Sequence, residues 1–110
     1  MELPQQESIA EAMNRLWVQY LPQIEERVRT LELVAVAHED GSVTAEHCEQ
    51  AMAAAHKLAG VLGTFGLPEG TRLAREMEAL YSRGTNALST ANGRTKEVAA
   101  QLRSMLTTRK

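Results

Sequence analysis

The sequence contains three histidines, His38, His47 and His56, whose side chains are the best suited to chemistry near neutral pH. Neutral imidazole can act as a nucleophile, a proton acceptor or a metal ligand. His47 and His56 lie about 180° apart on one predicted helix, so they cannot bind the same metal ion. His38 falls in a predicted turn without a partner nearby in the sequence, which favours a solvated loop residue. His56 therefore remains as the candidate.

The helix around His56 has one clear apolar stripe, and the histidine lies off it. At about 100° per residue, the imidazole projects roughly 130° from the centre of that stripe, which predicts a solvent-exposed ring. Nearly every residue predicted within about 60° of it is small. The stripe consists of Cys48, Ala51, Ala55, Leu58 and Leu62, and the neighbours of the ring are Met52, Ala53, Ala59, Gly60 and Gly63.

Two of those neighbours, Gly60 and Gly63, are unfavourable in a helix by about 1 kcal/mol each relative to alanine. Close approach of another macromolecule to the ring would explain them, because a larger side chain would obstruct it. Glycine near a helix end also permits a left-handed termination, which suits Gly63 better than Gly60. A solitary surface histidine is itself often only a solvated residue. The spacing alone does not decide between a docking surface around His56 and an ordinary solvated histidine near a helix end.

The residues that follow Ala55 carry a more specific pattern. His56 is followed by Leu58, Gly60 and Gly66, in the order His, any residue, Leu, any residue, Gly, with a second Gly six residues later. The segment from residue 55 to 67 resembles the active-site helix of histidine-containing phosphotransfer (HPt) domains, which are four-helix bundles of about this length. The resemblance implies that His56 is the phospho-accepting residue and that Gly60 lies beneath a docked receiver domain.

The segment departs from the family pattern at two positions. Many members carry Lys or Arg three residues after the histidine, where this sequence has Ala59, so the cation that often steadies the phosphoryl group is missing there. Lys57 is adjacent in sequence but about 100° around the helix, and could help only by curling back. Val61 is bulkier than the usual small residue. These departures imply slower transfer or a less stable phosphohistidine.

By this resemblance the reaction is a reversible attack of one His56 ring nitrogen on the aspartyl phosphate of a receiver domain. The expected partner is a response-regulator receiver domain, a hybrid histidine kinase, or both. Phosphoryl transfer depends mainly on positioning and on cationic groups. We expect the receiver to bring Mg²⁺ and a lysine, and this chain to bind no metal or other cofactor. The sequence lacks a glycine-rich phosphate loop and the length for an ATP-binding domain, so we expect a phosphocarrier without autokinase activity.

Two other function classes compete with the phosphocarrier. The absence of a cation at Ala59 favours an alternative in which the bundle binds or sequesters receiver domains without carrying phosphate. A hydrolase or metal enzyme is disfavoured, because paired carboxylates and metal-ligand spacings are missing. Cys48 lies on the apolar stripe and is expected to be a buried thiol, and Trp17 is expected to pack in the core.

Helices must position His56, and the composition favours them, since Pro and Gly are few and aromatic residues sparse. We predict one domain over residues 1–110, an all-α antiparallel four-helix bundle with an additional N-terminal helix or a kinked first helix. The first helix covers about residues 5–37, with Pro22 as a kink or a break, and its predicted stripe is Ile9, Met13, Leu16, Tyr20, Ile24, Val28 and Leu31.

The other predicted helices are placed by their caps. Residues 38–42 form a turn, Thr44 is the N-cap of the active-site helix over about residues 44–62, and residues 63–66 end it. Pro68 opens the third helix and Gly84 is its C-cap, whereas residues 85–93 form a polar connection. The buried residues of the last two helices are predicted to be Leu73, Met77, Leu80, Val98, Leu102 and Met105.

The charge and hydropathy of the sequence limit the kinds of partner that this chain is expected to bind. The formal net charge is −2 and the 12 basic residues are dispersed, which disfavours nucleic-acid binding. No apolar run reaches the roughly 18 residues of a membrane span, and residues 1–4 do not resemble a signal peptide. We therefore expect a cytoplasmic location without membrane attachment. The single cysteine cannot form an internal disulfide.

Overall fold

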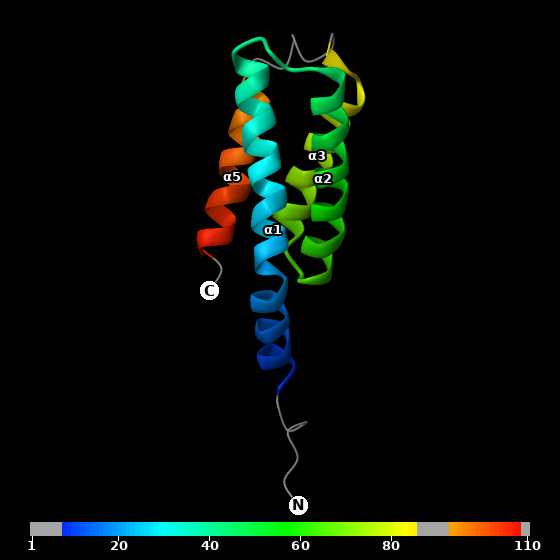
Figure 1. The fold of residues 1–110 in the computed structure, drawn as a ribbon. Helices are drawn as coiled ribbons and strands as arrows, with labels where there is room; N and C mark the ends of the chain where they lie inside the picture. Colours follow the sequence, from blue (N-terminus) through cyan, green and yellow to red (C-terminus); the bar gives the residue numbers. More distant parts are fainter. Residues whose placement is uncertain (1–7, 86–92, 109–110) are drawn as a thin grey trace, which may run out of the picture.

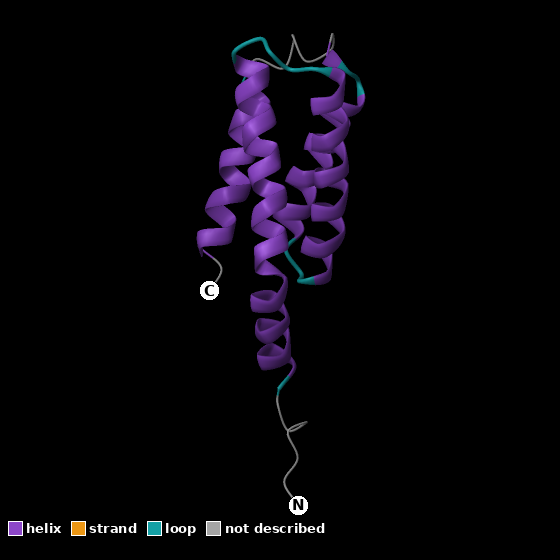
Figure 2. Ribbon diagram, in the orientation of Figure 1, coloured by secondary structure: helices purple, strands orange, loops and turns teal. Residues whose placement is uncertain are grey.

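The computed structural model describes residues 8–85 and 93–108. Within them lie four helices, α1 (Ile9–Glu39), α2 (Ala45–Thr64), α3 (Pro68–Ser82) and α5 (Arg94–Thr108) (Figure 1). The described residues contain no strand (Figure 2), which confirms the predicted all-α class. Residues 86–92 of the predicted polar connection and the predicted start of the first helix lie outside this part of the chain.

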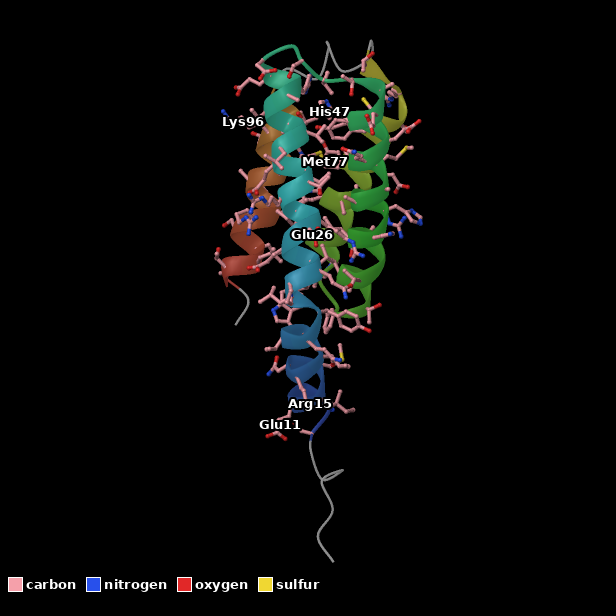
Figure 3. The ribbon with its side chains drawn as sticks, in the orientation of Figure 1. Glu11, Arg15, Glu26, His47, Met77 and Lys96 are labelled. Carbon is pink, nitrogen blue, oxygen red and sulfur yellow. The ribbon has the colours of Figure 1, made fainter. Side chains whose placement is uncertain are left out.

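Neighbouring helices pack in a ring. α2 contacts α1 and α3, and α5 contacts α3 and α1, which is the arrangement of an antiparallel four-helix bundle (Figure 1). The core is made of apolar side chains from all four helices, with Met77 of α3 lying among them (Figure 3). The largest fully buried apolar side chains are Ile24, Val28, Leu31, Leu58, Leu62, Met77, Val98 and Leu102. The predicted stripe of α2 is confirmed, as are Leu73, Met77, Val98 and Leu102, whereas Leu80 of α3 and Met105 of α5 are only half-buried, so their predicted burial is wrong.

The first helix ends at Glu39, two residues later than predicted, and it is continuous through Pro22. Ser8 caps it, because its Oγ accepts from the Glu11 N–H at 3.1 Å and the Glu11 carboxylate accepts from the Ser8 N–H at 2.9 Å. The alternative of two separate helices is wrong. Pro22 and Val18 are both exposed, so water can bond to the carbonyl that loses its partner to Pro22.

Both ends of α1 differ from the predicted pattern. Its first turns project beyond the other helices, so Ile9 is 84% exposed and not part of the core (Figure 1). Tyr20 is also exposed, whereas Trp17 is buried edge-on against Phe65 as expected for a core residue. At the other end His38 belongs to the last turn of α1. Its Nδ1 lies 2.9 Å from Thr95 Oγ1, so its predicted place in a solvated turn is wrong.

The caps of α2 and α3 follow the predicted residues closely. Thr44 Oγ1 accepts from the His47 N–H, and the Thr44 N–H donates to His47 Nδ1, both at 3.1 Å. His47 thus serves the first turn of α2, at the upper end of the bundle in Figure 3. Pro68 is at the start of α3. The C-cap of α3 is Arg83, one residue before the predicted Gly84, and Gly84 follows it with a φ of 85°.

Two ion pairs tie α5 to the rest of the bundle. Arg94 donates to Glu76 of α3 at 2.7 Å, and Arg103 donates to Glu32 of α1 at 2.9 Å. The hydrogen bonds from these guanidinium groups hold the pKa of each carboxyl below its usual value. Of the described helices, none is long and apolar enough to span a membrane.

Because α2 depends on the Thr44 cap, Thr44→Ala should lower the free energy of unfolding by about 1 kcal/mol. Urea denaturation monitored by circular dichroism measures this change. Thr107→Ala is the matched control, since its hydroxyl bonds only to carbonyls of its own helix and should change stability by less than about 0.5 kcal/mol. Equal losses for the two variants would contradict the assigned capping role.

Candidate functional site

His56 lies on the exposed side of α2, as its offset from the apolar stripe predicted. The side chain is 72% exposed, whereas Ala55 and Leu58, on either side of it in sequence, are fully buried. The stripe packs into the core because α2 contacts α1 and α3. Cys48, at the start of the same stripe, is a buried free thiol, and burial raises its pKa. A buried, protonated thiol is a poor nucleophile.

The ring of His56 is held from the neighbouring helix. Its Nδ1 lies 2.9 Å from Oε2 of Glu78 on α3. An ionised carboxylate can only accept a hydrogen bond, so a neutral ring bonded to it carries its proton on Nδ1 and keeps the lone pair on Nε2. Among the described residues Nε2 has no hydrogen-bond partner. In a neutral ring the contact therefore favours the Nδ1–H tautomer and leaves Nε2 open to solvent.

Sequence reasoning missed Glu78. In the sequence of α3, Arg72, Arg75 and Arg83 alternate with Glu76 and Glu78, a pattern typical of a solvated face with local ion pairs. The predicted local ion pairs are confirmed, since Arg72 pairs with Glu69 and lies 3.8 Å from Glu76. Both Glu76 and Glu78 also bond to other helices, however, and no pattern within α3 alone shows such partners. The signal that could have found Glu78 is the antiparallel register of α2 and α3.

The exposed residues around the ring form a shallow surface. Ala53, Lys57, Gly60 and Gly63 are exposed, and Met52 is half-buried. A Cβ built on Gly60 would meet nothing within 4 Å, whereas one on Gly63 would lie 3.6 Å from Thr71 Oγ1. The Gly60 position is therefore open to an approaching molecule. A shallow depression beside the ring is lined by Glu49, Met52, Ala53, His56, Lys57 and Glu78.

Ala59 is a correction to the predicted docking face. It is only 3% exposed, although the helical wheel places it about 60° from His56. The wheel of one helix does not show where a neighbour packs, and α3 covers this flank of α2. The predicted placement of Ala59 on the exposed face is therefore wrong. The other predicted docking residues are at least partly exposed to solvent, namely Met52, Ala53, Lys57, Gly60 and Gly63.

The other histidines do not join the site. His47 bonds within the N-terminal cap of α2, and His38 contacts Thr95 of α5. Neither side chain therefore lies beside His56. Within residues 8–85 and 93–108, no group of three or more His, Cys, Asp or Glu side chains could hold a metal ion. The site consists of one imidazole, one carboxylate that orients it, and an open surface.

Comparison with protein-family models identifies the family of this chain. The family model described as Hpt domain matches residues 15–109, which include His56, Glu78 and most of every described helix. Neither the curated proteins nor the solved structures gave a match. Hpt domains are helical bundles that act as phosphotransfer modules and interact with receiver domains and histidine kinases. The match covers most of the sequence, and the chain therefore belongs to the Hpt domain family.

Proposed function

We propose that this chain is a phosphocarrier of a phosphorelay, in which His56 reversibly accepts a phosphoryl group from the aspartate of a response-regulator receiver domain. The observation that carries the proposal is the exposed imidazole whose Nδ1 bonds to Glu78, leaving Nε2 free to attack. A hybrid histidine kinase that contains a receiver domain would serve as the same kind of donor. The chain itself has no autokinase activity in this proposal.

The transfer step needs no proton movement. The Nε2 lone pair forms a bond to phosphorus as the bond between phosphorus and the aspartyl oxygen breaks, and that electron pair returns to the aspartate carboxylate. The phosphorylated ring keeps its proton on Nδ1 and gains a positive charge. Glu78 faces this charge directly, so its carboxylate stabilises the product as well as orienting the reactant.

The receiver supplies the rest of the chemistry in this proposal. Phosphoryl transfer requires cations near the phosphoryl oxygens, and we assign the Mg²⁺ and a lysine to the receiver. The surface formed by Met52, Ala53, Lys57, Gly60 and Gly63 is where the receiver docks. Its open centre at Gly60 lets the aspartyl phosphate come within reach of Nε2.

Labelling tests the acceptor directly. A receiver carrying ³²P on its aspartate should transfer label to the wild-type chain in an acid-labile, alkali-stable form, and His56→Gln should take none. His47→Gln is the matched control, because glutamine at this capping position can still accept from the Thr44 N–H. It should be labelled normally. Wild-type protein that binds the receiver but never takes label would overturn the carrier and favour a sequestering adaptor.

Removing Glu78 should slow transfer without removing the acceptor. Glu78→Ala should lower the transfer rate by about 3- to 10-fold, because an exposed charge-assisted hydrogen bond contributes about 1 kcal/mol. Glu78→Gln keeps an acceptor oxygen and should lose less.

The ¹⁵N NMR signals of His56 separate orientation from general damage. The Nδ1–H form should dominate in wild type, and the Nε2–H form should gain population in Glu78→Ala. If the alanine variant keeps both the wild-type rate and the wild-type tautomer, Glu78 has no part in the reaction.

Bulk at Gly60 should block docking without unfolding the bundle. Gly60→Leu places its side chain in open space and improves helix propensity, so the free energy of unfolding should not fall. Receiver affinity, measured by titration calorimetry, should fall at least about 10-fold. Ala100→Leu, an equivalent exposed change on α5, should leave affinity unchanged. A Gly60→Leu variant with wild-type affinity would place the docking surface elsewhere.

A further inference from the structure

Two contacts define how α2 and α3 lie against each other. His56 Nδ1 of α2 bonds to Glu78 of α3, and a Cβ built on Gly63, farther along α2, would lie 3.6 Å from Thr71 Oγ1. Seven residues forward along α2 therefore correspond to seven residues back along α3. In this antiparallel register the residue opposite Ala59 is Arg75.

Arg75 lies on the same face of α3 as both contact residues. Thr71, Arg75 and Glu78 are spaced four and three apart, which puts them within about 60° of one another around the helix. Arg75 also lines the depression that contains Gly63, Gly66 and Thr71, so it borders the exposed surface of α2. Its Cα is about 4.5 Å along the helix axis from that of Glu78. An extended arginine side chain is longer than this offset.

Arg75 is also available to bind a new anion. It is exposed, and no carboxylate of the described residues forms an ion pair with it. The other arginines near it are engaged, since Arg72 pairs with Glu69 and Arg94 with Glu76. Ala59 is small, and a Cβ built on its neighbour Gly60 would meet nothing within 4 Å, so neither residue of α2 carries a long side chain at the level of Arg75.

We propose that Arg75 supplies, from α3, the cation that α2 lacks at Ala59, and that its guanidinium binds the phosphoryl oxygens on Nε2 of His56. This inference rests on the proposed function of His56. The planar guanidinium can donate two parallel hydrogen bonds to a phosphoryl group. Glu78 holds the Nδ1 side of the ring and Arg75 approaches the Nε2 side, so each charge meets one of opposite sign.

Lys57 is the competing cation. It lines the depression beside the ring, but it also lines a groove with Gln23, Glu26 and Thr30 between α2 and α1. That groove lies on the flank of α2 away from α3. The ammonium group can therefore stay near the Glu26 carboxylate, and reaching the phosphoryl group requires it to turn back across the helix.

The lifetime of the phosphohistidine tests this inference. The chain is phosphorylated by a labelled receiver, separated from it, and the loss of label at neutral pH is followed. Arg75→Gln should shorten the half-life by about 3- to 10-fold, because a guanidinium on the phosphoryl oxygens opposes the charge shift that breaks the phosphorus–nitrogen bond. Arg75→Lys should restore part of it.

Two control variants each remove one positive charge at another position. Arg29→Gln, on an exposed position of α1, and Lys57→Gln should keep the wild-type half-life. Arg75 Nε–H should also shift in NMR spectra when wild type is phosphorylated. If wild type takes label and Arg75→Gln decays at the wild-type rate, or if Lys57→Gln alone decays faster, the Arg75 assignment is wrong and the carrier function stands. If wild type never takes label, the proposed function itself fails.

Discussion

The hydrogen bond between His56 and Glu78 joins two helices, so it exists only while α2 and α3 keep one register. A slide by one residue would move the carboxylate about 1.5 Å along the axis and turn it about 100° away. The register is kept by packing below the surface, where Ala55 and Ala59 of α2 and Ala74 of α3 are buried. Small side chains allow close packing, and close packing leaves little freedom to slide.

The same packing explains why an exposed site can still be well ordered. Exposed side chains usually sample many rotamers, and a reactive group that does so spends little time in a productive geometry. Here the backbone beneath the imidazole belongs to a fully buried stripe, and the ring is bonded at one nitrogen. The bundle thus holds the imidazole in place without covering it, which suits the proposed exchange with a receiver domain.

Much of this arrangement follows from local sequence signals. The capping residue Thr44, the position of Pro68 and the apolar stripe with Cys48 and Leu58 depend on contacts within one helix, and a single sequence shows them. Ala59, Glu78 and His38 differ because their surroundings come from another helix. A helical wheel gives an angle relative to one stripe, but it does not reveal which flank a neighbour covers or which side chain reaches across. These residues could be placed only once the helices were packed together.

In the proposed reaction, the tautomer of His56 decides which isomer of phosphohistidine forms. An imidazole can be phosphorylated on either nitrogen, and the two products differ in stability and in the direction in which the phosphoryl group points. With Nδ1 occupied by the Glu78 carboxylate, only the nitrogen farther from the backbone is available. The Glu78 contact would then select phosphorylation at Nε2, and a partner would meet the phosphoryl group at the tip of the side chain.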